Sequence, residues 1–170
     1  MRNNPRFLGL ALTMVAAITA TSCFDPEHKD EVNALGGETN GVGPGPFHRP
    51  GQPCRVCHGG SGPGKPEFSI AGTIYAQRDV GQAKPGVEVT ITDVTGAART
   101  FTSNQAGNFY VSIDEWSPTF PVNVKLAFPG LDPATQTQMQ SPIGRNGGCG
   151  FCHYGADNEQ THMPPVYLQQ

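Results

Sequence analysis

The chain has 170 residues, a formal net charge of −3 and only 15% charged residues, and glycine (22) and proline (16) make up more than a fifth of it. This composition excludes a coiled coil or helical bundle, which contains far less glycine and proline, and the glycines lack the three-residue period of collagen. A slightly acidic chain gives no indication of nucleic-acid binding. The length and the 36% hydrophobic residues allow one domain with a modest core.

Residues 1–22 have the pattern of an export signal. Two arginines precede an uncharged apolar run at 7–20, which is shorter than the about 20 residues that a membrane-spanning helix needs. The run ends in Ala-Thr-Ser-Cys, which resembles the lipobox of bacterial lipoproteins, although that family prefers Leu where this chain has Ala20. The resemblance implies that Cys23 becomes an acylated N-terminus on a periplasmic or cell-surface protein, anchored by lipid to a bacterial membrane. Cleavage without lipidation is the alternative.

Residues 23–53 are predicted to form a flexible tether. The segment is acidic at its start and rich in glycine and proline afterwards, and it shows no apolar periodicity. Such sequences are typical of linkers. A short helix between Glu27 and Leu35 is possible.

Four of the five cysteines fall into two copies of Cys-x-x-Cys-His, at 54–58 and 149–153. This pattern is the attachment signature of c-type haem, in which two thiols on one side of a turn bond the haem vinyl groups and the next residue supplies the proximal iron ligand. Cys and His each occur five times, so about 0.004 matches are expected by chance. The sequence predicts two covalent haems, attached through Cys54, Cys57, Cys149 and Cys152, with His58 and His153 as the proximal ligands.

Two other interpretations of the cysteine pairs remain open. Two Cys-x-x-Cys knuckles could bind one tetrahedral zinc ion, although the pairs lie much farther apart than in zinc ribbons and the histidines would have no role. Two disulfides could also form, because an exported protein meets an oxidising compartment. Neither alternative requires a histidine directly after each pair.

The second axial ligand of each iron has several candidates. His48 lies shortly before the first motif and His162 shortly after the second, both in polar or Gly/Pro-rich surroundings. Met139 and Met163 compete with them, and a methionine ligand raises the reduction potential relative to a second histidine. The alternative for both histidines is an exposed position without a ligand role.

The two motifs and their glycine-rich surroundings resemble bacterial multihaem c-type cytochromes. The resemblance does not extend to the small helical cytochrome c fold, because no helices are predicted beside either motif. It implies an electron carrier rather than an enzyme, with two haem irons as cofactors and redox proteins of the cell envelope as partners.

Between the motifs, apolar and polar residues alternate with a period of two, which predicts β-strands. The expected strands are 68–75, 86–92, 99–103, 108–113 and 121–128, with possible edge strands at 135–139 and 166–168. Turn residues separate them, among them Pro85-Gly86 and Gly107. The spacing predicts an all-β fold, a small antiparallel sandwich between loop-rich haem-binding segments at 54–66 and 131–170.

The stretch 70–128 is similar to carboxypeptidase regulatory-like (transthyretin-like) domains. The residues that carry this resemblance are Gly-Thr-Ile-Tyr at 72–75, the strand at 86–93, and Gly-Asn-Phe-Tyr at 107–110. The resemblance implies an Ig/transthyretin-like sandwich over 67–130 that serves as a scaffold or binding module. Tyr75, Tyr110 and Trp116 could form a ligand platform.

The expected function is electron transfer by an exported dihaem cytochrome. Catalysis, for example by a dihaem peroxidase, would need an open iron position and acid–base groups, and no paired carboxylates lie beside either motif. A third possibility is an exported β-sandwich lipoprotein that binds carbohydrate or protein and uses its cysteines for zinc or disulfides. The two haems could lie together or at opposite ends of the sandwich, depending on the strand order.

Overall fold

The computed structural model describes residues 25–38, 40–78, 81–130, 132, 136–154 and 163–168. The predicted signal peptide, Cys23 and His162 lie outside these ranges. Within them, no helix has the length and apolar character needed to cross a membrane.

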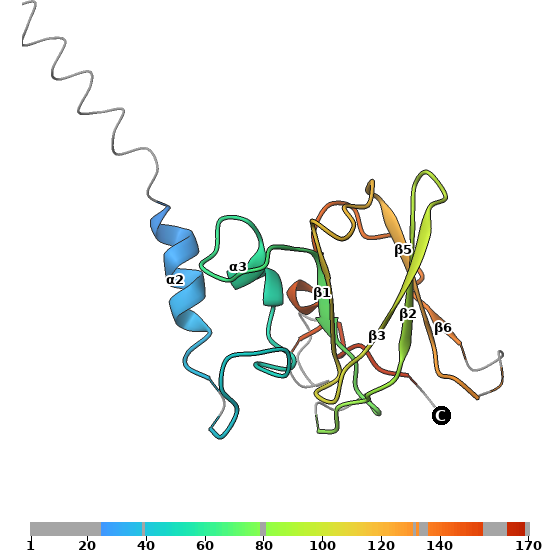
Figure 1. Cartoon of the computed structure of the whole chain (residues 1–170), viewed down its shortest axis with the longest axis horizontal. Helices are drawn as coiled ribbons and strands as arrows, with labels where there is room; N and C mark the ends of the chain where they lie inside the picture. The colour runs from blue at the N-terminus through green and yellow to red at the C-terminus, as the bar shows by residue number, and fades with distance from the viewer. Residues whose placement is uncertain are drawn as a thin grey trace, which may run out of the picture.

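The described chain is built mostly from strands, with short helices gathered beside them (Figure 1). In chain order the elements are α2 (Pro26–Ala34), α3 (Cys54–His58), β1 (Phe68–Thr73), β2 (Glu88–Asp93), β3 (Ala98–Thr102), β4 (Asn108–Ser112), β5 (Val122–Ala127), β6 (Thr137–Gln138), β7 (Gly147–Gly148) and the 3₁₀ turn η2 (Cys149–Phe151). The first motif is itself a helical turn and the second a 3₁₀ turn, which the sequence analysis did not predict.

The strands form two sheets, one ordered β4-β1-β7 and the other β3-β2-β5-β6. All pairings are antiparallel except that of β1 with β7. One hydrophobic core joins the sheets and includes Ile70, Val89, Phe109, Val111 and Leu126. The predicted all-β sandwich is confirmed.

The five main predicted strands are confirmed, with ends that shift by at most two residues. In β2, for example, Val89 and Ile91 are fully buried while Glu88 is exposed, as the alternation requires. The predicted edge strand at 135–139 corresponds to β6, which pairs with β5. At 166–168 the backbone forms a bridge between Tyr167 and Tyr75 rather than a full strand.

Strand β1 differs from the other long strands because all six of its residues are buried. A strand at the surface of a two-layer sandwich normally exposes every second residue. The outer face of β1 is covered on the side of α3, which carries the first motif, whereas Cys149 of η2 in the second motif lies against Gly72 and Phe109 on the core face. Both elements contact β1 (Figure 1). Strand β1 therefore contacts both motifs, the first on its outer face and the second on its core face.

The segment predicted as a tether contains folded structure next to the first motif. Helix α2 is capped by the Asp25 side chain, which accepts a hydrogen bond from the His28 backbone N–H. After the helix, Gly51 N–H donates to Thr73 Oγ1 (2.8 Å), and Asn108 Nδ2 donates to His48 O (3.0 Å). These contacts hold the loop around residue 48 against the sandwich and were not part of the linker prediction.

Candidate functional site

The strand β7 brings the two motifs to the same place. It pairs in parallel with β1, with Ile70 opposite Gly147 and Ala71 opposite Gly148, and it leads directly into Cys149. The first motif lies beside the same pair of strands, because helix α3 contacts both β1 and β7. Two sequence segments separated by the whole sandwich therefore meet at one edge of it.

Direct contacts join the two motifs. Arg55, inside the first motif, donates from Nη1 to Asn146 Oδ1 (2.8 Å) just before the second motif and from Nε to Phe68 O (2.8 Å). A methyl group at Gly150 would lie only 2.9 Å from the Cα of Pro53, the residue before Cys54. Glycine is thus needed between the cysteines of the second motif for this close packing, and the motifs lie side by side.

The four motif cysteines are free thiols. Burial raises the pKa of Cys149 to about 12, with a further contribution from the nearby Cys54. Burial also raises the pKa of Cys54 to about 11. Burial therefore keeps the first thiol of each motif protonated at neutral pH.

The ring of His58 is held in one orientation. Its Nδ1 lies 2.7 Å from the carbonyl oxygen of Pro66, and since a carbonyl only accepts, Nδ1 carries the proton and donates. Phe68 stacks on the ring at 4.3 Å between centroids, and a methyl group at Gly64 would lie 2.8 Å from the ring atoms. His58 as a whole is only 8% exposed. The tautomer that results leaves the Nε2 lone pair free to bind a metal.

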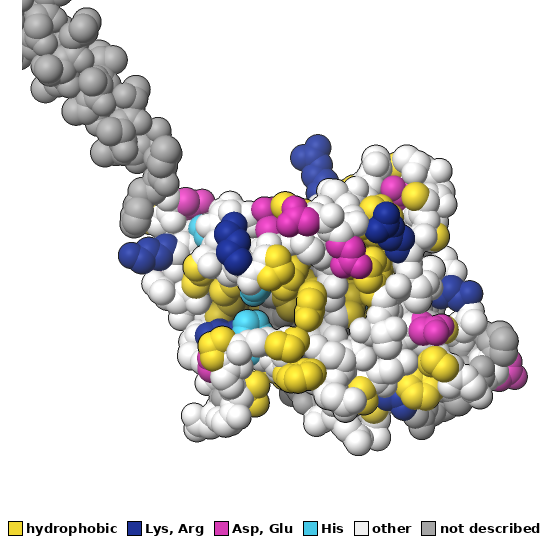
Figure 2. Space-filling view, viewed as in Figure 1, with side chains coloured by type: hydrophobic (Ala, Val, Ile, Leu, Met, Phe, Trp, Pro, Cys, Tyr) yellow, Lys and Arg dark blue, Asp and Glu magenta, His cyan; other side chains and the backbone are white. Residues whose placement is uncertain are grey.

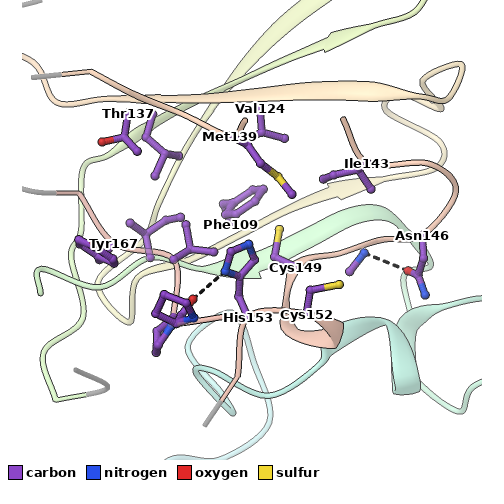
Figure 3. Close-up of a pocket in the computed structure, with 16 residues that line it drawn as sticks. Phe109, Val124, Thr137, Met139, Ile143, Asn146, Cys149, Cys152, His153 and Tyr167 are labelled. Carbon is purple, nitrogen blue, oxygen red and sulfur yellow. Dashed lines mark hydrogen bonds between the residues drawn. The ribbon is translucent and has the colours of Figure 1, made fainter. Parts of the chain in front are cut away.

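His153 in the second motif repeats this arrangement. Its Nδ1 lies 2.7 Å from the carbonyl oxygen of Pro164, drawn as a dashed line in Figure 3. The backbone around it is fixed by a bridge to Met163, whose N–H donates to Cys152 O (3.0 Å). The same tautomer follows, with Nε2 free. Sequence reasoning missed the roles of Pro66 and Pro164, because a backbone carbonyl leaves no side-chain pattern.

Each motif lines its own cavity. The first, of about 620 Å³, is bounded by the first motif together with His48, Phe68 and Tyr110. The second, of about 230 Å³, is bounded by the second motif together with Phe109 and Met139 (Figure 3). Figure 2 shows histidine side chains among hydrophobic ones where the surface is hollowed near α3. Small-molecule cofactors bind in concave sites that are mostly apolar, as these are.

His48 lies close to the first motif. Its ring centroid is 5.9 Å from that of His58, at an interplanar angle of 56°. Its buried Nδ1 lies 3.5 Å from Glu38 Oε1. The structure therefore brings this candidate ligand close to His58, and its bond to iron remains a prediction.

The two methionine candidates have different surroundings. Met139 lines the second cavity, on the side opposite His153 (Figure 3). The side chain of Met163 is 48% exposed, although its backbone pairs with His153. Of the two, Met139 is the one whose side chain faces the site.

The other predicted features are placed differently. Tyr75 is buried and Trp116 packs against Phe101, so these residues do not join Tyr110 in one exposed platform. Within the part of the chain that the structure describes, no group of three or more His, Cys, Asp or Glu side chains is arranged to hold a metal ion. The zinc interpretation thus has no preformed ligand group among these residues.

Comparison with protein-family models, with curated proteins and with solved structures found no match. The resemblances to multihaem cytochromes and to transthyretin-like domains therefore rest on the sequence motifs alone.

Proposed function

We propose that the protein is an exported dihaem c-type cytochrome that transfers electrons at the cell envelope. The observation that carries this proposal is the repeated geometry of the two motif histidines. Each donates from Nδ1 to a proline carbonyl at 2.7 Å, and each lines a cavity together with the two cysteines of its motif. The repetition comes from unrelated local structures, so a common ligand is its simplest explanation.

The residues present fit haem c. Cys54 and Cys57, and likewise Cys149 and Cys152, would form the thioether bonds, while the Nε2 atoms of the following histidines would bind iron. A hydrogen bond from Nδ1 to a carbonyl oxygen is the usual second contact of a metal-binding histidine, because it fixes the tautomer and makes the ring a stronger ligand. When bound, the haems would supply one-electron redox chemistry.

The sandwich would serve as a rigid mount for the two haems. Both motifs contact β1, and Cys149 of the second motif lies against Gly72 on the face that also contributes Ile70 to the core. The contacts of Arg55 and Gly150 across the motifs support haems that lie close together, with electron transfer between them inside one molecule. A transthyretin-like relationship would agree with such a scaffold role.

Electron transfer fits the two cavities better than catalysis does. Within the described residues, Glu38 is the one carboxylate that lines either cavity, and it already accepts a hydrogen bond from Arg49 (3.1 Å). A haem enzyme of the peroxidase type would need free acid–base groups beside an open iron position. The export signal and Cys23 in the sequence support a lipid-anchored, periplasmic or cell-surface location.

The test is a count of covalent haems on protein produced in a host with cytochrome c maturation. A pyridine haemochrome spectrum, combined with the protein concentration, should give two haems per chain. The double variant Cys54→Ala/Cys57→Ala should retain one haem, and so should Cys149→Ala/Cys152→Ala. A colourless protein with bound zinc or two disulfides would contradict the proposal and favour the exported β-sandwich binding protein instead.

A further inference from the structure

We propose that the two iron sites are chemically unequal, with His48 as the second axial ligand of the first haem and Met139 as that of the second. This inference rests on the proposed function. It assigns a direction to electron transfer between the two haems, because the two ligand sets give different reduction potentials.

The spacing of His48 and His58 suits two ligands of one iron. Metal–imidazole bonds are about 2.0–2.1 Å long, so two imidazole rings on opposite sides of one metal have their centres about 6 Å apart. The observed separation is 5.9 Å. Nδ1 of His58 is bound to Pro66 O, and Nδ1 of His48 faces Glu38, so Nε2 is the available nitrogen of each ring.

Glu38 completes this side of the site. Nδ1 of His48 and Oε2 of Glu38 are both buried and without a hydrogen bond. If Nε2 of His48 binds a metal, Nδ1 must carry the proton, and the carboxylate of Glu38 is then its acceptor. The acceptor atom is Oε1 of Glu38, which lies 3.5 Å from Nδ1 of His48.

The loop that carries His48 is held in an uncommon conformation. Arg49 has a φ of 48°, in the left-handed region that non-glycine residues rarely adopt. Its side chain compensates by donating to Glu38 Oε1 (3.1 Å), Gln52 Oε1 (3.0 Å) and Gly36 O (2.7 Å). Backbone strain that is held in place by several contacts is typical of a functional position.

Met139 has the corresponding place in the second cavity. Figure 3 shows its sulfur turned into the cavity above Phe109 and Cys149, with His153 on the other side. Its backbone N–H donates to Val124 O (3.0 Å), which ties the residue to the β5 strand. A thioether is a suitable sixth ligand for a haem iron whose other axial ligand is histidine.

Unequal axial ligands give electron transfer between the two haems a direction. A His/Met set has a higher reduction potential than a His/His set. The second haem is therefore reduced first, and electrons that enter at the first haem pass to the second.

The experiment is a potentiometric titration of the dihaem protein, combined with the visible and near-infrared spectrum of its ferric form. We expect two separate one-electron steps and the long-wavelength absorption band of thioether-ligated ferric haem at the intensity of one haem. Met139→His should abolish the band and lower the upper potential towards the lower one. His48→Met should raise the lower potential instead.

Two matched controls locate the ligand. Met163→Leu and His162→Ala should leave the band and both potentials unchanged, with two haems retained in every variant. The inference is overturned if the dihaem protein lacks the thioether band, if Met163→Leu removes it, or if Met139→His leaves both potentials unchanged. Each of these results preserves the proposed function, whereas a chain without covalent haem refutes the function itself.

Discussion

The two motif regions reach the same histidine geometry through different local structures. The first motif is a helical turn, α3, with His58 buried between Phe68 and Gly64. The second is a 3₁₀ turn with an exposed second cysteine, Cys152. The proline carbonyl that accepts the Nδ1–H bond lies eight residues after His58 but eleven residues after His153. The shared requirement is thus the hydrogen bond of the ring, and the backbone that delivers it is free to vary.

The largest effect should follow from removing the aromatic ring that the second site shares with the core. Phe109 is 2% exposed and lines the second cavity, whereas its neighbour Tyr110 lines the first. Phe109→Ala should lower the free energy of unfolding by about 3–5 kcal/mol, because it leaves a cavity. Chemical denaturation combined with haem counting should show that structure and haem are lost at the second motif before they are lost at the first.

Tyr110→Ala is the matched control for this prediction. Tyr110 is 39% exposed, so its removal should cost much less stability and should change the spectrum of the first haem rather than the second. Equal effects of the two variants on both haems would show that the sites are not separated by the two faces of β4.

A smaller loss of stability is expected from a substitution that pushes the two motifs apart but leaves both of them in place. Gly150→Ala places a methyl group 2.9 Å from the Cα of Pro53, which is backbone and cannot rotate away. We expect a loss of about 1–3 kcal/mol, the usual cost of overpacking, with both haems retained. Thermal unfolding followed by circular dichroism measures it. At Gly144 an added methyl group meets nothing within 4 Å, so Gly144→Ala should be close to neutral.

Loss of the hydrogen bonds of Arg55 should lower the free energy of unfolding by less than the substitution at Gly150. Arg55→Ala removes the bonds to Asn146 Oδ1 and Phe68 O, and hydrogen bonds to charged groups contribute about 1.5 kcal/mol or more. We therefore expect urea unfolding to show a loss of about 1.5 kcal/mol. Asn146→Ala should reproduce part of this loss, and a double variant no worse than Arg55→Ala would show that the two residues act together.

The smallest effect on the sites should come from Asp93, which lies away from both cavities. Hydrogen bonds from the Thr95 hydroxyl and from the N–H groups of Thr119, Thr95 and Ala97 hold its pKa below the ordinary value. The carboxylate therefore stabilises the fold above the unfolded pKa of about 3.9, and this contribution is lost as the pH falls through the lower folded pKa. Asp93→Asn should flatten the acid limb of a stability–pH curve and leave both haem spectra unchanged. A change in either spectrum would contradict the separation of this turn from the sites.

The sequence predicted the strands well and the meeting of the motifs poorly. Residues such as Val89, Ile91 and Val111 alternate with polar neighbours, and this period identifies a strand directly. Strand β7 consists of Gly147 and Gly148, which have no side chains and therefore no period, yet this strand places the second motif beside the first.

The chemistry of the sites was also predicted unevenly. The motifs pointed to the cysteines and the two following histidines, because in the proposed sites these side chains are themselves the attachment points and ligands. The carbonyl acceptors of Pro66 and Pro164 are backbone atoms whose position depends on the folded chain. Arg49 and Glu38, which hold the loop of His48, lie in a segment whose composition indicates a linker.

The central claim, two c-type haems side by side on one sandwich, is tested most directly by circular dichroism in the Soret region. Two haems close together should give a bisignate couplet in the dihaem protein. The couplet should disappear in Cys149→Ala/Cys152→Ala and in Cys54→Ala/Cys57→Ala, each of which keeps one haem. A dihaem spectrum equal to the sum of the two single-haem spectra would contradict the account, because it would place the haems too far apart to interact.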